Sequence, residues 1–165
     1  MDEKHQEALV GLREAMMLEV KGTKFFQRAS ELTQDPKGKA TFERLVKVEM
    51  EHYNILEAEY NALSQTGRWL SYQEVDKARK KKSDISDISN IFVREGFTEQ
   101  LQDDTTDLEA LKLAIDLEKK AGDHFQEAVR HAQDPLAKEV YQTLAKEEEK
   151  HLKLFEAEYE YVIQS

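Results

Sequence analysis

Apolar residues recur at intervals of three and four over four long segments of the chain, which is the spacing of amphipathic helices. The first two segments fall within about residues 3–64, and the last two within residues 106–163. Within each pair the connection is only a few residues long, so the two helices should form an antiparallel hairpin. The pattern predicts an all-α fold, an antiparallel four-helix bundle made of two hairpins.

The two predicted hairpins repeat one pattern at an offset of 99 residues. Asp35-Pro36 recurs as Asp134-Pro135, in each case an N-cap followed by a proline at the first helical position. Glu57-Ala58-Glu59-Tyr60 recurs as Glu156-Ala157-Glu158-Tyr159. We therefore expect one domain over residues 1–165, built from a duplicated helical hairpin.

A different pattern fills residues 65–105, between the hairpins. Ser71-Tyr72-Gln73-Glu74 fits a capping box that opens a short helix through Arg79, whereas residues 83–90 are rich in turn formers and are predicted to be a loop. So long a connection is best explained as a crossover to the far end of the second hairpin. Four apolar residues are available to pack on the bundle: Ile91, Phe92, Val93 and Phe97.

Two further features of the crossover have interpretations of their own. Trp69, beside a predicted break at Gly67, is expected to anchor the crossover to the bundle. The basic run Arg79-Lys80-Lys81-Lys82 would suit an acidic partner, but no aromatic residue is interleaved with it. We interpret the run as a solvated stretch.

Composition agrees with a helical protein and excludes several classes of function. Charged residues make up 35% of the chain, with only 2 Pro and 6 Gly, which favours polar-faced helices over sheet. No apolar run is long enough to cross a membrane, and Met1 is followed by charged residues where a signal peptide would be apolar. We expect a cytoplasmic location and no membrane partner. The net charge of −10 argues against nucleic-acid binding.

The chain contains no cysteine. Disulfides, zinc–thiolate sites and iron–sulfur clusters are therefore excluded from it, and Glu, Asp and His are the available metal ligands. Any electrons that a metal site needs must come from another molecule.

Acidic residues and histidines interrupt the apolar stripes at repeated positions. A Glu-x-x-His pair occurs in each half, and a lone Glu precedes each pair by 30 residues. One such pair alone would be interpreted as solvent-exposed, but both copies lie on the apolar stripe. The repeated set is Glu19, Glu49, His52, Glu118, Glu148 and His151.

Burial of this set calls for cations. Burying four carboxylates without positive charge would cost several kcal/mol each, even after relaxation. The i, i+3 spacing places Glu and His about 60° apart around the helix, so one side chain can bridge two ions while the other caps one. Gly22 and Ala121, one turn after the lone glutamates, leave room for water or a small oxidant. We therefore predict a pair of metal ions between the helices.

These motifs resemble the ferritin-like di-iron carboxylate family and, within it, the rubrerythrin group, over essentially the whole chain. The resemblance implies two irons bridged by carboxylates and chemistry on peroxide or dioxygen, often in a homodimer. Three features depart from the group's pattern. A cysteine-ligated iron module is absent, Ala121 replaces a common additional Glu, and Phe26, mirrored by Phe125, replaces a common Tyr. The missing Glu weakens the prediction of a peroxidase cycle that relies on ligand exchange, and leaves the prediction of metal binding intact.

We therefore predict a di-iron oxidoreductase that reduces hydrogen peroxide or dioxygen with electrons from an external donor such as a rubredoxin-like protein. Glu49 and Glu148 would bridge, Glu19 and Glu118 would be terminal ligands, and His52 and His151 would each cap one ion. A homodimer is expected, domain-swapped or not. Two alternatives are a non-catalytic iron-handling protein, of ferroxidase or storage type, and an interaction module that its metals hold together. The ligands suit iron, manganese or a mixed pair.

Other polar residues near the motifs are interpreted as non-ligands. His124 lies about 240° around the helix from Glu118 and should face away from the metals. Tyr141 lies on the ligand stripe, where a core role is favoured over a redox role. His5 and His131 are predicted to face solvent. The same is favoured for each of Glu51, Glu147 and Glu149, over the alternative that one of them holds a histidine ring in place.

Overall fold

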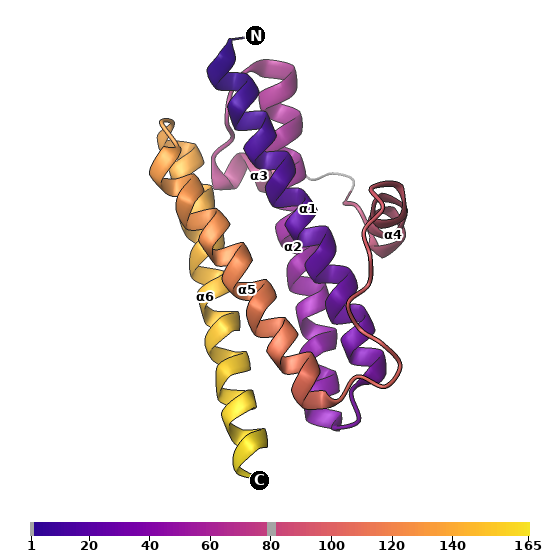
Figure 1. Ribbon diagram of the computed structural model, residues 1–165. Coiled ribbons are helices and arrows are strands. Elements are labelled where there is room, and N and C mark those ends of the chain that lie inside the picture. The colour runs from indigo at the N-terminus through magenta and orange to yellow at the C-terminus, as the bar shows by residue number, and fades with distance from the viewer. Residues whose placement is uncertain (1, 79–81) are drawn as a thin grey trace.

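The computed structural model describes residues 2–78 and 82–165. Over these residues the chain forms six helices: α1 (Glu3–Leu32), α2 (Pro36–Thr66), α3 (Tyr72–Ala78), α4 (Ile85–Arg94), α5 (Asp107–His131) and α6 (Pro135–Gln164). Helices α1 and α2 form one antiparallel hairpin and α5 and α6 form the other (Figure 1). The predicted all-α bundle of two hairpins is confirmed. None of the described helices is both long and apolar enough to span a lipid bilayer.

The hairpin helices begin at the predicted caps. The Asp35 carboxylate accepts the backbone N–H of Gly38 at 3.1 Å, and the Asp134 carboxylate accepts that of Leu136 at 2.8 Å. Helix α2 continues a little beyond the predicted limit because nothing breaks it before Gly67. That residue ends the helix with a φ of 71°, in the left-handed region that glycine adopts without a steric cost.

The crossover contains the predicted short helix. The N–H of Ser71 donates to the Glu74 carboxylate at 2.8 Å, and the N–H of Glu74 donates to Ser71 Oγ at 3.2 Å. This capping box opens α3 as predicted. Of the basic run, residues 79–81 lie outside the described residues, whereas Lys82 pairs with Glu51 at 3.9 Å.

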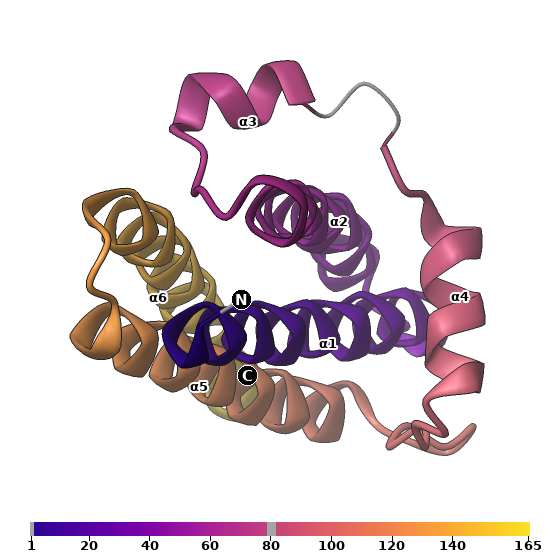
Figure 2. The ribbon, with the colours of Figure 1, turned by 90° about the horizontal axis from the view of Figure 1, so that it is seen from above.

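The prediction of a loop over residues 83–90 is wrong, because α4 begins at Ile85. Asp84 accepts the N–H of Asp87 at 3.2 Å, and Asp87 accepts the N–H of Asp84 at 2.9 Å, so these turn-forming residues act as a helix cap. Ile88 is fully buried. Helix α4 packs on the outside of α1 and lies across it (Figure 2).

Three of the four apolar residues predicted to pack on the bundle do so: Ile91, Phe92 and Phe97. The prediction is wrong for Val93, which is 78% exposed because α4 turns it outward. The anchoring role of Trp69 is confirmed, since its buried ring lies edge-on to that of Tyr141 with the centroids 6.0 Å apart.

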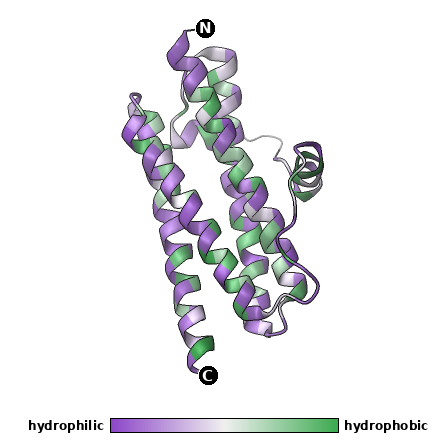
Figure 3. Cartoon of the chain, viewed as in Figure 1, coloured by the Kyte–Doolittle hydropathy of each residue, from purple (hydrophilic) through white to green (hydrophobic). Residues whose placement is uncertain are grey.

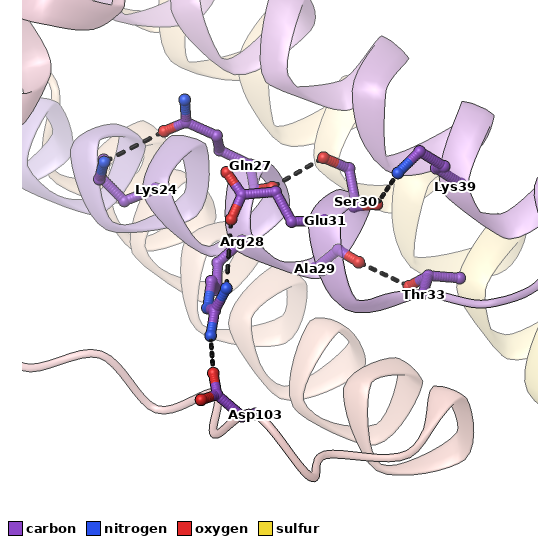
Figure 4. A network of polar contacts seen from close by, with 9 residues as sticks. All are labelled: Lys24, Gln27, Arg28, Ala29, Ser30, Glu31, Thr33, Lys39 and Asp103. Atoms are coloured by element: carbon purple, nitrogen blue, oxygen red, sulfur yellow. Dashed lines mark hydrogen bonds and ion pairs between the residues drawn. The ribbon is translucent and has the colours of Figure 1, made fainter.

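Polar contacts fix the far end of the crossover against the α1–α2 turn. Arg28 on α1 pairs with Asp103 of the crossover and with Glu31 at 3.2 Å (Figure 4). The backbone N–H groups of residues 34 and 35 donate to the Asp107 carboxylate at 3.2 and 3.3 Å. Helix α5 therefore starts at the opposite end of the bundle from the end of α2, as predicted for a crossover.

Hydrophobic residues alternate with polar ones along the long helices (Figure 3) and form two buried clusters. One cluster includes Leu12, Leu56 and Phe125. The other is built around three stacked rings, those of Phe26, Phe42 and Phe155, with centroids 5.6–6.0 Å apart. In all four long helices, the Glu and His motif positions fall between residues of the two clusters.

Candidate metal centre

All six sequence-predicted residues converge in the polar layer between the two hydrophobic clusters. Each long helix contributes, and no residue of the set, counted with its backbone, is more than 8% exposed. They form two overlapping groups in which the candidate ligand atoms lie within 4.8 Å of one another. The groups are Glu19, Glu49, His52 and Glu148, and Glu49, Glu118, Glu148 and His151. Glu49 and Glu148 thus belong to both groups, which is the placement expected of residues that bridge two ions.

Each imidazole directs Nδ1 toward the carboxylates. His52 Nδ1 lies 3.6 Å from Glu19 Oε1 and 3.3 Å from Glu148 Oε1. His151 Nδ1 lies 3.5 Å from Glu118 Oε2 and 3.6 Å from Glu49 Oε1. The two rings are nearly parallel, with centroids 6.1 Å apart. The repeat that relates the two motifs in sequence is therefore also present in space, because each group places one imidazole beside its carboxylates in the same way.

Most polar side-chain atoms of the six motif residues lack hydrogen-bond partners. Among the described residues, ten buried side-chain N or O atoms have none, and eight of them belong to the six motif residues. Buried polar atoms are normally paired, and each unpaired one is costly. Cations between the helices would satisfy these atoms and balance the carboxylate charge. The donor set of carboxylate oxygens and imidazole nitrogens therefore fits two metal ions.

The protonation of the layer reflects the crowding of its carboxylates. Burial, reinforced by Glu49, raises the pKa of Glu118 to about 10, and the same causes raise the pKa of Glu19 well above its usual range. Burial alone would lower the pKa of His151, but its contacts with Glu118, Glu148 and Glu49 raise it to about 11. Protons thus neutralise charge where cations would, so metal binding should release protons.

Gly22 leaves space beside one of the shared carboxylates. A Cβ atom at this position would lie 3.5 Å from Glu49 Oε2. This is an ordinary van der Waals contact, so a methyl group would fit here, and the predicted room for water or a small oxidant stays a prediction.

A comparison with protein-family models shows to which family the chain belongs. The family model for rubrerythrin matches residues 12–159. The chain belongs to the rubrerythrin family. Within these 165 residues it lacks the rubredoxin-type module, because it has no cysteine. No curated protein sequence matches it.

A solved structure shows the same fold. The chain is similar to a crystal structure of a two-domain protein from Anabaena variabilis that contains DJ-1/ThiJ/PfpI-like and ferritin-like domains. The TM-score is 0.66 at 13% sequence identity, and the match covers 98% of this chain and 38% of the other. This member of the rubrerythrin family therefore has a ferritin-like fold and spans well under half the length of that neighbour.

The structure corrects one prediction about the acids that flank the motifs. Glu147 does not simply face solvent, because its Oε2 lies 3.5 Å from His52 Nε2. The other two flanking acids form exposed ion pairs, Glu51 with Lys82 and Glu149 with Lys153. A signal for Glu147 exists in the sequence, since it immediately precedes Glu148, but the contact depends on how α6 crosses α2.

The other residues that were predicted not to be ligands lie outside the two groups of the rubrerythrin-family site. His124 lies outside both groups, next to the Phe125 ring, and Tyr141 is buried in the core. His131 is exposed as predicted. His5 is partly solvated, with its side chain 32% exposed, and its Nε2 also lies 2.8 Å from the Gly67 carbonyl oxygen.

Glu59 is a buried acid that sequence reasoning missed. Its side chain is 0% exposed, and one carboxylate oxygen accepts the N–H of Leu70 at 3.1 Å. Burial raises the pKa of Glu59 to about 7. The sequence repeat does not indicate this burial, since the equivalent Glu158 is partly exposed.

Proposed function

We propose that this member of the rubrerythrin family is a di-iron oxidoreductase that reduces hydrogen peroxide or dioxygen. The observation that carries the proposal is the pair of overlapping groups, each with three carboxylates and one imidazole, buried between two hydrophobic clusters. Four carboxylates match the charge of two divalent ions, which is the usual balance of a di-iron site in a helical bundle.

Each residue has a role in this proposal. Glu49 and Glu148, common to both groups, would hold both ions. Glu19 and Glu118 would be ligands of one ion each, as would His52 and His151. Two irons bound there would supply the electrons and the Lewis acidity for the reduction. The hydrophobic clusters on either side keep bulk water out, and Gly22 places no side chain beside Glu49.

The electrons and the assembly are parts of the proposal. The chain has no cysteine to hold an electron-transfer centre, so an external donor, such as a rubredoxin-like protein, returns the irons to the ferrous state. Reduction of one peroxide to two waters takes two protons and two electrons, and a bound iron pair would supply the electrons. We also propose that the protein acts as a homodimer.

Stopped-flow oxidation of the ferrous-loaded protein tests the catalytic proposal. We expect peroxide to disappear faster than with the same concentration of free ferrous ion, and E49Q to remove this difference. Equal rates for the protein and the free ion would defeat the catalytic proposal while leaving metal binding untouched.

Iron handling without peroxidase turnover is a second candidate, and Ala121 favours it. This position commonly holds an additional Glu in the rubrerythrin group, and here it carries only a methyl group. A site restricted to six ligands suits the binding of iron better than repeated ligand exchange. Size-exclusion chromatography of the iron-loaded protein separates the two, because a shell-forming store elutes as a very large assembly and a dimeric enzyme does not.

A further inference from the structure

The two candidate metal positions have equal donor sets but unequal surroundings. Each group combines three carboxylates with one imidazole. Both imidazoles direct Nδ1 inward, which leaves Nε2 as the nitrogen that faces other residues. Any difference between the two positions must therefore arise around the ligands.

Such a difference lies at Nε2 of His52. Glu147, on α6, places its Oε2 3.5 Å from this nitrogen, and its side chain remains 42% exposed. The offset of 99 residues relates Glu147 to Val48 on α2, which has no carboxylate and packs against a hydrophobic cluster. The side chain of His52 is 4% exposed and that of His151 is 11% exposed. The histidine with the acidic partner is thus also the better enclosed one.

A carboxylate at the distal nitrogen of a metal-binding histidine fixes the tautomer and the ring orientation, and makes the ligand more basic. We propose that Glu147 is a positioning residue for His52, and that the ion held by Glu19, Glu49, His52 and Glu148 binds more tightly than its neighbour. This inference rests on the proposed di-metal function. Loss of such a partner typically weakens metal binding about 10- to 100-fold.

Manganese serves as the probe, because Mn²⁺ is stable in air and suits these ligands. Crystals of the full chain are grown with one equivalent of Mn²⁺, and anomalous scattering at the manganese edge gives the occupancy of each position. In the wild type we expect the stronger peak next to His52. In E147Q, which removes the charge but keeps the side-chain size, this preference should disappear, and calorimetry with Mn²⁺ should show the tighter step weakened about 10- to 100-fold.

Glu149→Gln is the matched control, because Glu149 is a neighbouring exposed acid whose partner is Lys153; this variant should behave as the wild type does. Val48→Glu supplies the missing carboxylate and should shift occupancy toward the position next to His151. Equal peaks in the wild type, or an unchanged preference in E147Q, would overturn the inequality while leaving the two-metal site intact. Absence of manganese from both positions in the wild type, together with absence of iron from crystals grown with ferrous ion, would instead defeat the proposed function and this inference with it.

Discussion

The two hairpins share one sequence pattern, yet they lie in different surroundings. Helix α1 buries eleven residues, whereas its repeat α5 buries five. The difference arises because α1 packs against α2, α4 and α5, while α5 packs mainly against α6 and α1. Burial in this fold is therefore set by the crossover as much as by the repeated pattern.

The positions at which the hairpins agree and differ separate two kinds of constraint. The six residues of the two metal motifs are the same in both copies, as Glu19 and Glu118 are. Residues whose neighbours differ have diverged in identity or environment, as Val48 and Glu147 have in identity and Glu59 and Glu158 have in burial. The residues of the candidate metal site are thus repeated in both hairpins, and the differences follow what covers each hairpin.

The largest expected effect is the loss of bound metal when a carboxylate shared by both groups is replaced. Replacing a carboxylate that belongs to one group should remove less metal. Replacing Glu49 or Glu148 by Gln removes a charged ligand from both groups, so bound metal should fall from about two ions per chain toward none. E19Q or E118Q affects one group only and should leave about one ion. Elemental analysis after dialysis measures this, and equal metal content in E49Q and E19Q would contradict the bridging roles.

Core substitutions test whether the repeat gives equal stability to both hairpins. Phe26 and Phe125 occupy equivalent positions and are both 0% exposed. F26A and F125A should each lower the free energy of unfolding by about 3–5 kcal/mol, through lost burial and the cavity left behind. Urea denaturation of the metal-free protein measures this, with the exposed Val93→Ala as a control expected within about 0.5 kcal/mol of the wild type. A large loss of unfolding free energy in only one of F26A and F125A would show that the two positions do not contribute equally to stability.

Glu59 should give the first hairpin a pH dependence of its own. Burial raises its pKa from 4.5 to about 7, so the folded state holds this proton more tightly than the unfolded state does. That contribution is fully present below about pH 4.5 and is lost as pH rises through 7. Relative to the wild type, E59Q should therefore gain stability between pH 5 and 8, on the order of 2 kcal/mol. Thermal unfolding across this range measures it.

The matched control for Glu59 is Glu158→Gln, at the partly exposed equivalent position in α6. Its stability relative to the wild type should change much less over the same pH range. Identical pH profiles for E59Q and E158Q would show that the burial of Glu59 has no energetic consequence.

The smallest expected effect concerns the helix caps that both hairpins share. D35A and D134A each remove an acceptor for a first-turn N–H, and each should cost about 1 kcal/mol. Chemical denaturation measures the loss, with exposed Asp116→Ala in mid-helix as a control. If D35A and D134A lost different amounts of stability, the two turns would not be energetically equivalent, although each has the same Asp-Pro sequence.

The bundle and the convergence of six polar residues could be predicted because both follow from periodicity. Residues three or four apart share a helix face, and the short turn keeps Glu19 level with Glu49. Helix α4 could not be predicted, because its Ser and Asp residues are typical of turns and its folding depends on burying Ile88. The contact of Glu147 with His52 depends on the packing of α6 against α2. The burial of Glu59 depends on where the crossover lies, which no local pattern encodes.

Anomalous scattering at the iron and manganese edges, from crystals grown with ample ferrous or manganous salt, tests the central claim most directly. The structure predicts two ions in the polar layer, one beside Glu19 and His52 and the other beside Glu118 and His151. Glu49 and Glu148 should contact both. A polar layer without ions, in which these side chains turn outward into solvent, would contradict the account.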